Sequence, residues 1–512
     1  MAFEGIVLAM LYLAVIVFCL VAAGFVAVVS YIMYLRRVKY AHIPGPPVKN
    51  FFKGHFDEFA NKGTRRGLPT SEYQRQILQT YGKVVLMWLY HIPIVVVDSP
   101  DLIKEILVTK NYPKSKLMFS TVTSLYGQRF LGTGLVTNMN EENWKIKRRL
   151  INPAFHRKYL KFMLPQMNSC CDILINKLAE KADGKTRVHM LNELTNLTLD
   201  IICKVGFGVD LNVIFDENAP FKKAVETSLE AARDAFVKST LEMIKRAFAI
   251  STQQKNAIEA VRLIRKTGKE IIQKRREELK NGGDDLPLDL LTCILKTCES
   301  DHETIATENL IDEFVTFFVA GHQTVASILA SLLMELSDQP KIEEKLVREM
   351  NDVIAERNEV DFNDLDKLKY VGFAFKEILR RHAPSSSAYR VTAQEENIGG
   401  YMIPSNTIID VNFYATSHNP EYFEEPFKFN PERWELREVQ KSSQYTWTPF
   451  STGPRNCVGQ TFAQIEAKLV FTRLLRAFEF SFVEGQTKCM TQGFVKPRDG
   501  VICTLKLRES CC

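Results

Sequence analysis

Cysteine pairs with the Cys-x-x-Cys spacing are absent from this sequence, although Cys170–Cys171 and Cys511–Cys512 are adjacent. Its 512 residues include eleven cysteines, and none of them forms a Cys-x-x-Cys pair. Disulfide frameworks need regularly spaced cysteines, and an odd number cannot all pair within one chain. We therefore expect reduced cysteines in a folded part that faces the cytosol.

A strong charge imbalance is also missing. The net charge of +6 is modest for a chain of this length, so the composition does not indicate nucleic-acid binding. A local basic face for an acidic protein partner or for lipid headgroups stays open.

Linkers and repeats are missing after residue 50. The chain there has no Gly/Ser-rich tract, no long run of like charge and no internal repeat. Domain boundaries usually fall in such linkers, so we expect one large domain. Its patterns are mainly helical, at 156–182, 190–206, 218–246 and 252–280, with a β hairpin at 84–97 and a β-rich region at Asn397–Val411.

One long apolar run stands near the start. Residues 5–35 carry no charged side chain, and about 20 apolar residues suffice for a helix to cross a bilayer. Arg36, Arg37 and Lys39 follow at once, so the positive-inside rule places the rest of the chain in the cytosol. A cleaved signal peptide would have an apolar region about half as long that ends in small residues. We expect a transmembrane anchor at 5–35, a basic stop and proline hinge at 36–50, which includes HIPGPP, and a folded domain at 51–512.

The chain is organised around Phe450–Gly459, which reads FSTGPRNCVG and leads into a helical pattern at 460–478. Cys457 is the only cysteine there, and a single thiolate can bind a soft metal if its pKa is lowered. Gly453 predicts a tight turn, Gly459 allows a close backbone approach, and the positive end of the helix faces the sulfur.

Two further residues of this stretch indicate what the sulfur holds. Phe450 can cover the sulfur, and Arg455 can meet an anionic group. One thiolate with one arginine and no second Cys or His fits haem iron and its propionates better than zinc, which needs three or four ligands. A lone Cys-x-Gly before a helix is usually a buried, inert cysteine, but the whole ten-residue pattern favours a metal ligand.

The pattern Phe-x-x-Gly-x-Arg-x-Cys-x-Gly resembles the signature of the haem-thiolate monooxygenases, the cytochrome P-450 superfamily, and the resemblance covers essentially the whole chain. It implies a mainly α fold with a small β region, the cytochrome P-450 fold, preceded by one N-terminal transmembrane helix. It implies haem b with Cys457 as axial ligand of the iron, and electrons from NADPH through a partner reductase, with cytochrome b5 as a second candidate partner. The proline hinge looks like that of microsomal members, so we expect a single-pass protein of the endoplasmic reticulum membrane with a cytosolic catalytic domain.

The stretch 309–337 is apolar on all faces over most of its length, which predicts a buried central helix of roughly 40 Å. Its middle reads Ala320-Gly321-His322-Gln323-Thr324. Gly321 and Thr324 are both unfavourable inside an apolar helix. Tight helix packing, and a hydrogen bond from Thr324 to the carbonyl four residues earlier, would explain them without a function.

The resemblance offers a functional explanation for the same residues. They match the oxygen-activation motif Ala-Gly-x-(Glu/Asp)-Thr, which implies that Gly321 leaves room above the iron and that the Thr324 hydroxyl donates to dioxygen. Ala320, Gly321, Gln323 and Thr324 are therefore our catalytic candidates. Gln323 replaces the usual acid and cannot titrate, so we expect protons to travel through Thr324 and water.

Three more residues are assigned to the cofactor by the resemblance. Trp144 and Arg148 lie four apart on a helix and share a face. Alone they would be a surface tryptophan and a solvated base, but the matching pair in the family binds a haem propionate. Arg390, before the β-rich region, resembles a further propionate-binding arginine.

A structural triad is also implied. Glu377 and Arg380 look like the family's Glu-x-x-Arg pair, and Arg433 looks like the arginine that completes a buried triad bracing the cysteine loop. Elsewhere such a pair would be a routine surface ion pair. The chain departs from the family at Arg381-His382-Ala383-Pro384, where Tyr-Pro-Pro is usual.

The stretch 117–140 is apolar and patternless, and we expect an irregular segment that lines a pocket. Candidates for the wall of the substrate pocket are Phe119, Tyr126, Phe317, Ala320 and Ala388.

The substrate expectation rests on a narrower likeness. YAHIPGPP, EFVTFFVAGHQT and the ending VICTLKLR are most similar to the animal cholesterol 24-hydroxylases, so a sterol side chain is our first choice of C–H bond to receive one oxygen atom of O₂. The alternatives are a fatty-acid or xenobiotic hydroxylase, a reductase-independent isomerase or dehydratase of lipid peroxides, and a haem sensor or carrier without turnover.

Overall fold

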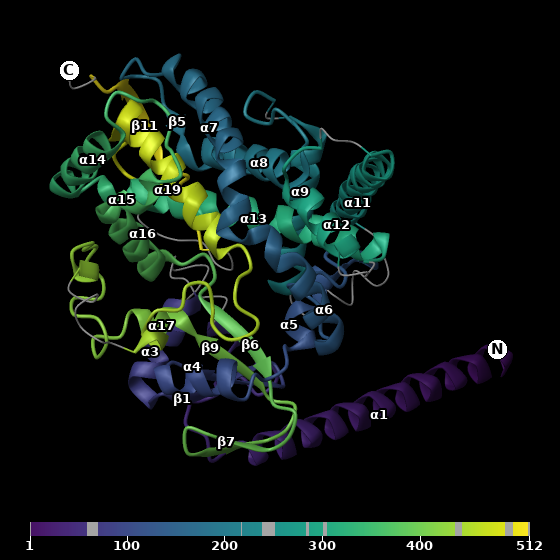
Figure 1. Cartoon of the computed structure of the whole chain (residues 1–512). Helices are drawn as coiled ribbons and strands as arrows, with labels where there is room; N and C mark the ends of the chain where they lie inside the picture. Colours follow the sequence, from purple (N-terminus) through teal and green to yellow (C-terminus); the bar gives the residue numbers. More distant parts are fainter. Residues whose placement is uncertain are drawn as a thin grey trace.

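The central helix α13 (Thr307–Leu336) organises the fold (Figure 1). The computed structural model describes residues 2–58, 70–216, 218–237, 251–282, 286–300, 305–435, 443–486 and 495–509. α13 packs against α8 (Met190–Phe207), α11 (Thr252–Lys280), α16 (Lys369–His382) and α19 (Gln460–Ala477). Although α13 is long and apolar enough to cross a membrane, 78% of its apolar window is buried inside the protein. The prediction of a buried central helix at 309–337 is confirmed.

Most of the predicted helices are present. Patterns at 156–182, 190–206 and 252–280 correspond to α7 (Arg157–Ala179), α8 and α11. The prediction at 218–246 is met by α9 (Pro220–Val237), and the remainder lies outside the described residues. The remaining helical segments are α2 (Phe56–Glu58), α3 (Thr70–Tyr81), α4 (Pro100–Lys104), the π-helix η2 (Glu105–Thr109), α5 (Lys116–Thr123), α6 (Glu141–Ile151), the 3₁₀ helices η3 (Asn152–Phe155) and η4 (Gln444–Thr446), α12 (Leu290–Ser300), α14 (Pro340–Ile354), α15 (Asp364–Lys367) and α17 (Phe413–Ser417).

The largest sheet lies to one side of the helices, with strand order β1-β2-β9-β6 (Figure 1). Its strands are β1 (Val84–Leu89), β2 (Ile92–Val97), β9 (Ile408–Asn412) and β6 (Ser387–Val391); β2 and β9 pair in parallel and the other pairs are antiparallel. The predicted hairpin at 84–97 is confirmed. Smaller sheets join β10 (Phe478–Phe482), β11 (Ile502–Leu507) and β5 (Val188–His189), then β7 (Glu396–Ile398) with β8 (Tyr401–Ile403), and β3 (Ser124–Leu125) with β4 (Gln128–Arg129).

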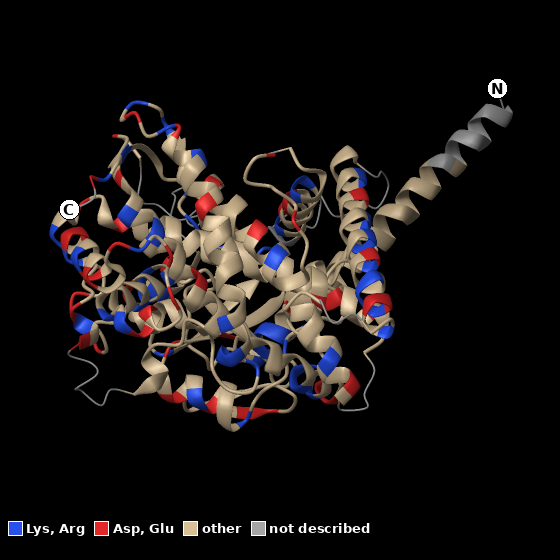
Figure 2. Cartoon of the chain, turned by 45° about the horizontal axis from the view of Figure 1, so that its top comes forward, with Lys and Arg blue, Asp and Glu red and all other residues tan. Residues whose placement is uncertain are grey.

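The N-terminal helix α1 (Ala2–Lys39) projects away from the rest of the protein (Figure 1). An 18-residue apolar window within Tyr12–Lys39 is not buried by the protein, and Figure 2 colours no residue as charged along the described part of α1 that projects outward. α1 therefore fits a single transmembrane anchor.

The hinge after α1 is seated on the large sheet. The Tyr40 hydroxyl lies 2.7 Å from Thr407 Oγ1, and its ring meets Trp88 edge-on at 5.6 Å. Ile43 is buried, and the Leu86 N–H donates to the Pro44 carbonyl at 2.8 Å. Part of the predicted 36–50 hinge thus packs as one piece with the folded domain, and a domain boundary at residue 51 remains a prediction.

The expectation of an irregular segment at 117–140 was wrong for its first part. Residues 116–123 form α5, and β3 and β4 form a short hairpin. The stretch from Leu117 to Leu125 contains neither glycine nor proline, so nothing in it breaks a helix. Glycines begin at Gly127, and the backbone is irregular mainly from Leu131 to Asn140.

Candidate functional site

The cysteine loop enters α19 as predicted. The Cys457 N–H donates to the Phe450 carbonyl at 2.9 Å, which closes the loop behind the sulfur. Gly453 has φ +75°, and a Cβ there would lie 2.1 Å from the Leu107 carbonyl oxygen of η2, so no other residue fits. A Cβ at Gly459 would meet Cys457 Sγ at 3.9 Å, an ordinary contact distance. The tight turn at Gly453 is confirmed, whereas steric crowding within the chain does not by itself require glycine at 459.

The chain alone does not lower the pKa of Cys457, contrary to the prediction from the sequence. The Cys457 side chain is accessible, yet it lies deep among other segments, and this burial raises the pKa of its thiol. The Gly459 N–H and the Arg148 guanidinium act in the opposite sense but do not outweigh desolvation. A bound metal cation would supply the missing positive charge, because a coordinating thiol is deprotonated.

Four cations gather beside this loop. Arg148 of α6 donates to the Asn456 carbonyl and side-chain oxygen, both at 2.9 Å. Arg455 lies over the Trp144 ring at 3.9 Å and donates to the Asn138 carbonyl at 2.9 Å. Arg390 of β6 forms a backbone bridge with the fourth cation, Lys114.

Lys114 is a member of the cluster that the sequence does not predict. Its ammonium donates to the Val136 carbonyl at 2.7 Å and lies 4.9 Å from the centre of the Phe119 ring. No spacing signal in the sequence identifies it, because a β bridge to a residue far along the chain brings it to the site.

The cation cluster of Lys114, Arg148, Arg390 and Arg455 has no ion pair with a carboxylate anywhere in the described part of the chain. Burial, and to a smaller extent the charges of Arg390 and Arg455, lower the pKa of Lys114 to about 7. Burial also lowers the pKa values of Arg390 and Arg455 to about 10 each. The Nε of Arg390 is buried without a hydrogen-bond partner. Such a cluster fits a bound group that carries carboxylates, as haem does through its propionates.

The donor set also fits haem rather than a protein-held metal ion. Among the residues that the structure describes, no group of three or more His, Cys, Asp or Glu side chains could hold a metal ion. Cys457 would therefore be the protein ligand to the iron, and the cofactor itself would supply the other donor atoms.

The central-helix motif has packing explanations within the chain. A Cβ at Gly321 would lie 3.3 Å from Ile202 of α8, so glycine there permits close helix packing. The Thr324 hydroxyl donates to the Ala320 carbonyl at 2.7 Å. The Gln323 amide has no hydrogen-bond partner in the described part of the chain. The catalytic roles of these residues remain predictions.

The pocket candidates lie in different surroundings. Phe119 and Tyr126 are partly buried, and Phe119 contacts Lys114 of the cation cluster. Phe317 is buried between aromatic rings, 5.4 Å from Phe155 and 6.5 Å from Phe207. Ala388, in β6, packs against the apolar cluster around the large sheet, and Ala320 is half-buried on α13.

The predicted triad is assembled in the structure. Glu377 is fully buried and accepts hydrogen bonds from Arg380 Nε and Nη2 at 2.9 and 2.8 Å, and from Arg433 Nε at 3.0 Å. The Trp434 indole N–H adds a bond of 3.0 Å, and its ring packs on Trp447 at 5.0 Å, shortly before the cysteine loop. The triad is thus linked to that loop through two tryptophans.

Comparisons with known proteins agree with this geometry. The family described as Cytochrome P450 matches residues 44–505. The chain is 28% identical to Cytochrome P450 4d2 of Drosophila melanogaster over 80% of this chain and 83% of that protein. It is 28% identical to Cytochrome P450 4F4 of Rattus norvegicus (88% and 87%) and 26% identical to Cytochrome P450 3A29 of Sus scrofa (91% and 92%). These relatives support the superfamily, but not the narrower likeness to the cholesterol 24-hydroxylases.

Proposed function

The chain belongs to the cytochrome P450 family, and from this premise we propose that it hydroxylates a C–H bond of a lipophilic substrate at a site built on Cys457. As a member of the family it is a monooxygenase that uses haem b, O₂ and electrons passed from NADPH through a partner reductase. The observation that carries the site assignment is the cation cluster without carboxylate partners beside a single cysteine.

We propose separate roles for the residues that would hold the cofactor. Cys457 would bind the iron, with the Gly459 N–H and Arg148 stabilising negative charge on the sulfur. Lys114, Arg390 and Arg455 would bind the two carboxylates. Haem supplies the oxygen chemistry, to which the thiolate contributes electron density.

We propose that residues of α13 deliver the protons that the reaction consumes. The Thr324 hydroxyl oxygen can accept a hydrogen bond from water while its proton is held by the Ala320 carbonyl. Gln323 can orient a water molecule through its amide, but it cannot carry a proton by changing charge. We therefore propose that protons pass through water and the Thr324 hydroxyl.

For the substrate, we propose a fatty acid or another non-sterol lipophile ahead of a sterol side chain. The sterol choice rested only on the likeness to cholesterol 24-hydroxylases, and the relatives with names in the P450 4 and 3A groups do not support that likeness. Phe119, which contacts Lys114 of the cation cluster, is the pocket candidate that the geometry favours most.

We propose that the protein is anchored by α1 in the endoplasmic reticulum membrane, with the folded domain in the cytosol. The basic residues after the apolar part of α1 support this orientation. Cytochrome b5 is proposed as an additional electron donor.

The function is tested by incubating the full-length holoenzyme with reductase, NADPH and a mixture of fatty acids, sterols and xenobiotics, followed by mass spectrometry. We expect products heavier by one oxygen atom that require both NADPH and reductase. Products that form from lipid peroxides without reductase would favour an isomerase or dehydratase instead. Replacing Cys457 by His should remove the absorption band of the reduced carbon monoxide complex that thiolate-bound haem gives.

A further inference from the structure

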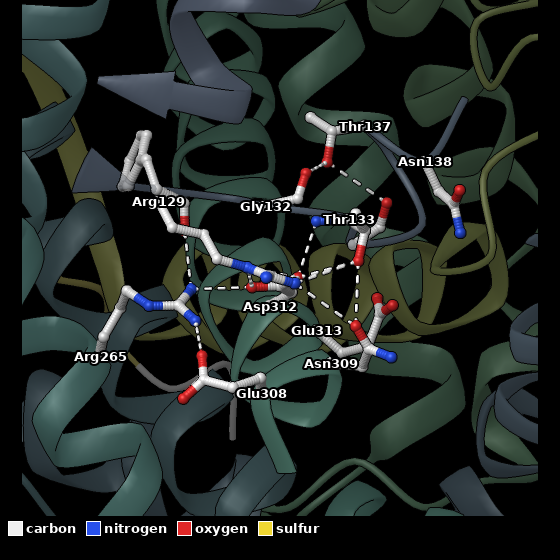
Figure 3. A network of polar contacts seen from close by, with 12 residues as sticks. Arg129, Gly132, Thr133, Thr137, Asn138, Arg265, Glu308, Asn309, Asp312 and Glu313 are labelled. Carbon is white, nitrogen blue, oxygen red and sulfur yellow. Dashed lines mark hydrogen bonds and ion pairs between the residues drawn. The ribbon is translucent and has the colours of Figure 1, made fainter. Parts of the chain in front are cut away.

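The segment from Arg129 to Asn138 is fixed to the first half of α13 by a polar network that the site description does not use (Figure 3). At its centre, the Asp312 carboxylate is completely buried. It accepts hydrogen bonds from Arg129 Nη2 at 2.5 Å, from the Thr133 N–H at 2.7 Å and from Arg265 Nη1 at 2.8 Å. Burial alone would raise the pKa of Asp312, but Arg129, the Thr133 N–H and Arg265 together lower it, so the carboxylate is charged.

The next residue of α13 makes a second connection to the same segment. Glu313 accepts the Leu135 N–H at 3.0 Å and lies 3.3 Å from the ammonium of Lys147. Lys147 in turn donates to the Thr133 carbonyl at 2.7 Å. Two adjacent acids on one helix therefore hold three consecutive residues of backbone, Thr133 to Leu135.

Two glycines let this backbone lie directly on the helix. A Cβ at Gly132, which has φ +53°, would lie 2.3 Å from Asp312 Oδ1. A Cβ at Gly134 would lie 2.1 Å from Thr316 Oγ1. Because any side chain at either position would push the segment off α13, its distance from the helix is fixed.

The far end of the segment meets the cation cluster. The Val136 carbonyl accepts from Lys114 at 2.7 Å, and the Asn138 carbonyl accepts from Arg455 at 2.9 Å. These are the only hydrogen bonds that the two charged groups make with the described part of the chain. Displacing the segment would remove these two hydrogen bonds, which hold Lys114 and Arg455 in place.

We propose that Asp312 and Glu313 are positioning residues for the cofactor: they hold residues 132–138 on α13 so that the Val136 and Asn138 carbonyls fix Lys114 and Arg455 where the haem carboxylates bind. The inference rests on the assignment of the cation cluster to haem and is independent of the substrate. It gives a role to two buried acids that lie more than two turns before Thr324 on the same helix.

The test measures transfer of the cofactor to excess apomyoglobin from holoenzyme loaded with either haem or haem dimethyl ester, whose carboxylates carry no charge. In the wild type, the ester should leave at least tenfold faster than haem. Asp312→Asn and Glu313→Gln should each reduce this ratio at least threefold. Glu308→Gln is the matched control, because Glu308 contacts Arg265 of the same network but not the segment, and its ratio should stay within twofold of the wild type.

The ratio separates positioning from general destabilisation. A residue that only stabilises the fold would speed the release of both cofactors equally, and an unchanged ratio in Asp312→Asn and Glu313→Gln would overturn the proposal. If these variants do not fold, Arg129→Gln is used instead. It removes a hydrogen bond to Asp312 from a side chain that is 43% exposed, and the same release ratio is measured. A wild-type ratio near one would instead refute the assignment of the cation cluster to the haem carboxylates.

Discussion

Replacing Glu377 by Gln should be among the most damaging single changes outside the cysteine loop. The carboxylate accepts five hydrogen bonds: two from Arg380, and one each from Arg433 Nε, the Trp434 indole and the Asn430 N–H. A glutamine has one acceptor oxygen, and its NH₂ group would face donors. The Arg380 guanidinium would keep its charge in a site where it is 1% exposed.

The expected loss in the free energy of unfolding follows from the burial of Arg380. Breaking a buried ion pair by removing one partner typically costs about 3–5 kcal/mol, because the remaining charge stays buried without compensation. With an entropy of unfolding near 2 cal/mol/K per residue, a domain of several hundred residues loses roughly 1 °C in Tm per kcal/mol, so we expect a fall of roughly 3–5 °C. Haem occupancy should fall as well, because Trp434 connects the triad to Trp447 before the cysteine loop.

Thermal unfolding followed by circular dichroism, with haem content measured on the same samples, tests this expectation. The control is Glu344→Gln, which breaks an ion pair with Arg348 whose two side chains are about 70% exposed and should contribute under about 1 kcal/mol. Equal, small losses in both variants would mean that Glu377 is not a structural centre of this region.

Three further predictions follow from the site and the hinge. Gln323→Glu should raise the product formed per NADPH consumed, because a titrating acid relays protons, and Thr324→Ala should lower it; equal yields in all three enzymes would place proton delivery elsewhere. A chain that starts at Lys39 should keep the Tm of the full-length protein. One that starts at Val48 should have a Tm several °C lower, because it lacks the buried side chains of Tyr40 and Ile43, each of which stabilises the fold by about 1.5–3 kcal/mol. Scanning calorimetry of the two shortened chains tests this difference. Burial raises the pKa of Glu313 from an ordinary value of 4.5 to about 7, although Lys147 acts to lower it. The folded state therefore keeps the proton on this carboxyl up to a higher pH than the unfolded state does. Stability from this group should therefore fall as pH rises from about 4.5 to about 7, and a pH series of Tm values should show a shallower fall in Glu313→Gln.

The features that the sequence predicted well are those that a short stretch of chain specifies by itself. The turn at Gly453, the apolar run that becomes α13 and the hairpin at 84–97 all depend on neighbouring residues, and all are present. The members of the triad are also found together, although their association could be expected only from the resemblance to the family.

Features that depend on distant contacts could not be predicted. Lys114 reaches the cation cluster through a bridge to Arg390, a pairing that no local pattern encodes. An apolar helix such as α13 also does not show which side chains face a pocket, and Phe317 packs between two aromatic rings contributed by η3 and α8. The shift of the Cys457 pKa was misjudged because desolvation depends on how many other segments surround the sulfur.

The cation cluster has a consequence for how the protein is made. Its four charges arrive from separate segments: one before α5, one in α6, one in β6 and one in the cysteine loop. Without a counter-charge their repulsion opposes the docking of these segments, so the folded chain should be less stable without the cofactor than with it. A ligand that binds only the native state draws folding toward that state. Supply of the dicarboxylate cofactor would then set how much of the newly synthesised chain matures and how much is left to proteolysis.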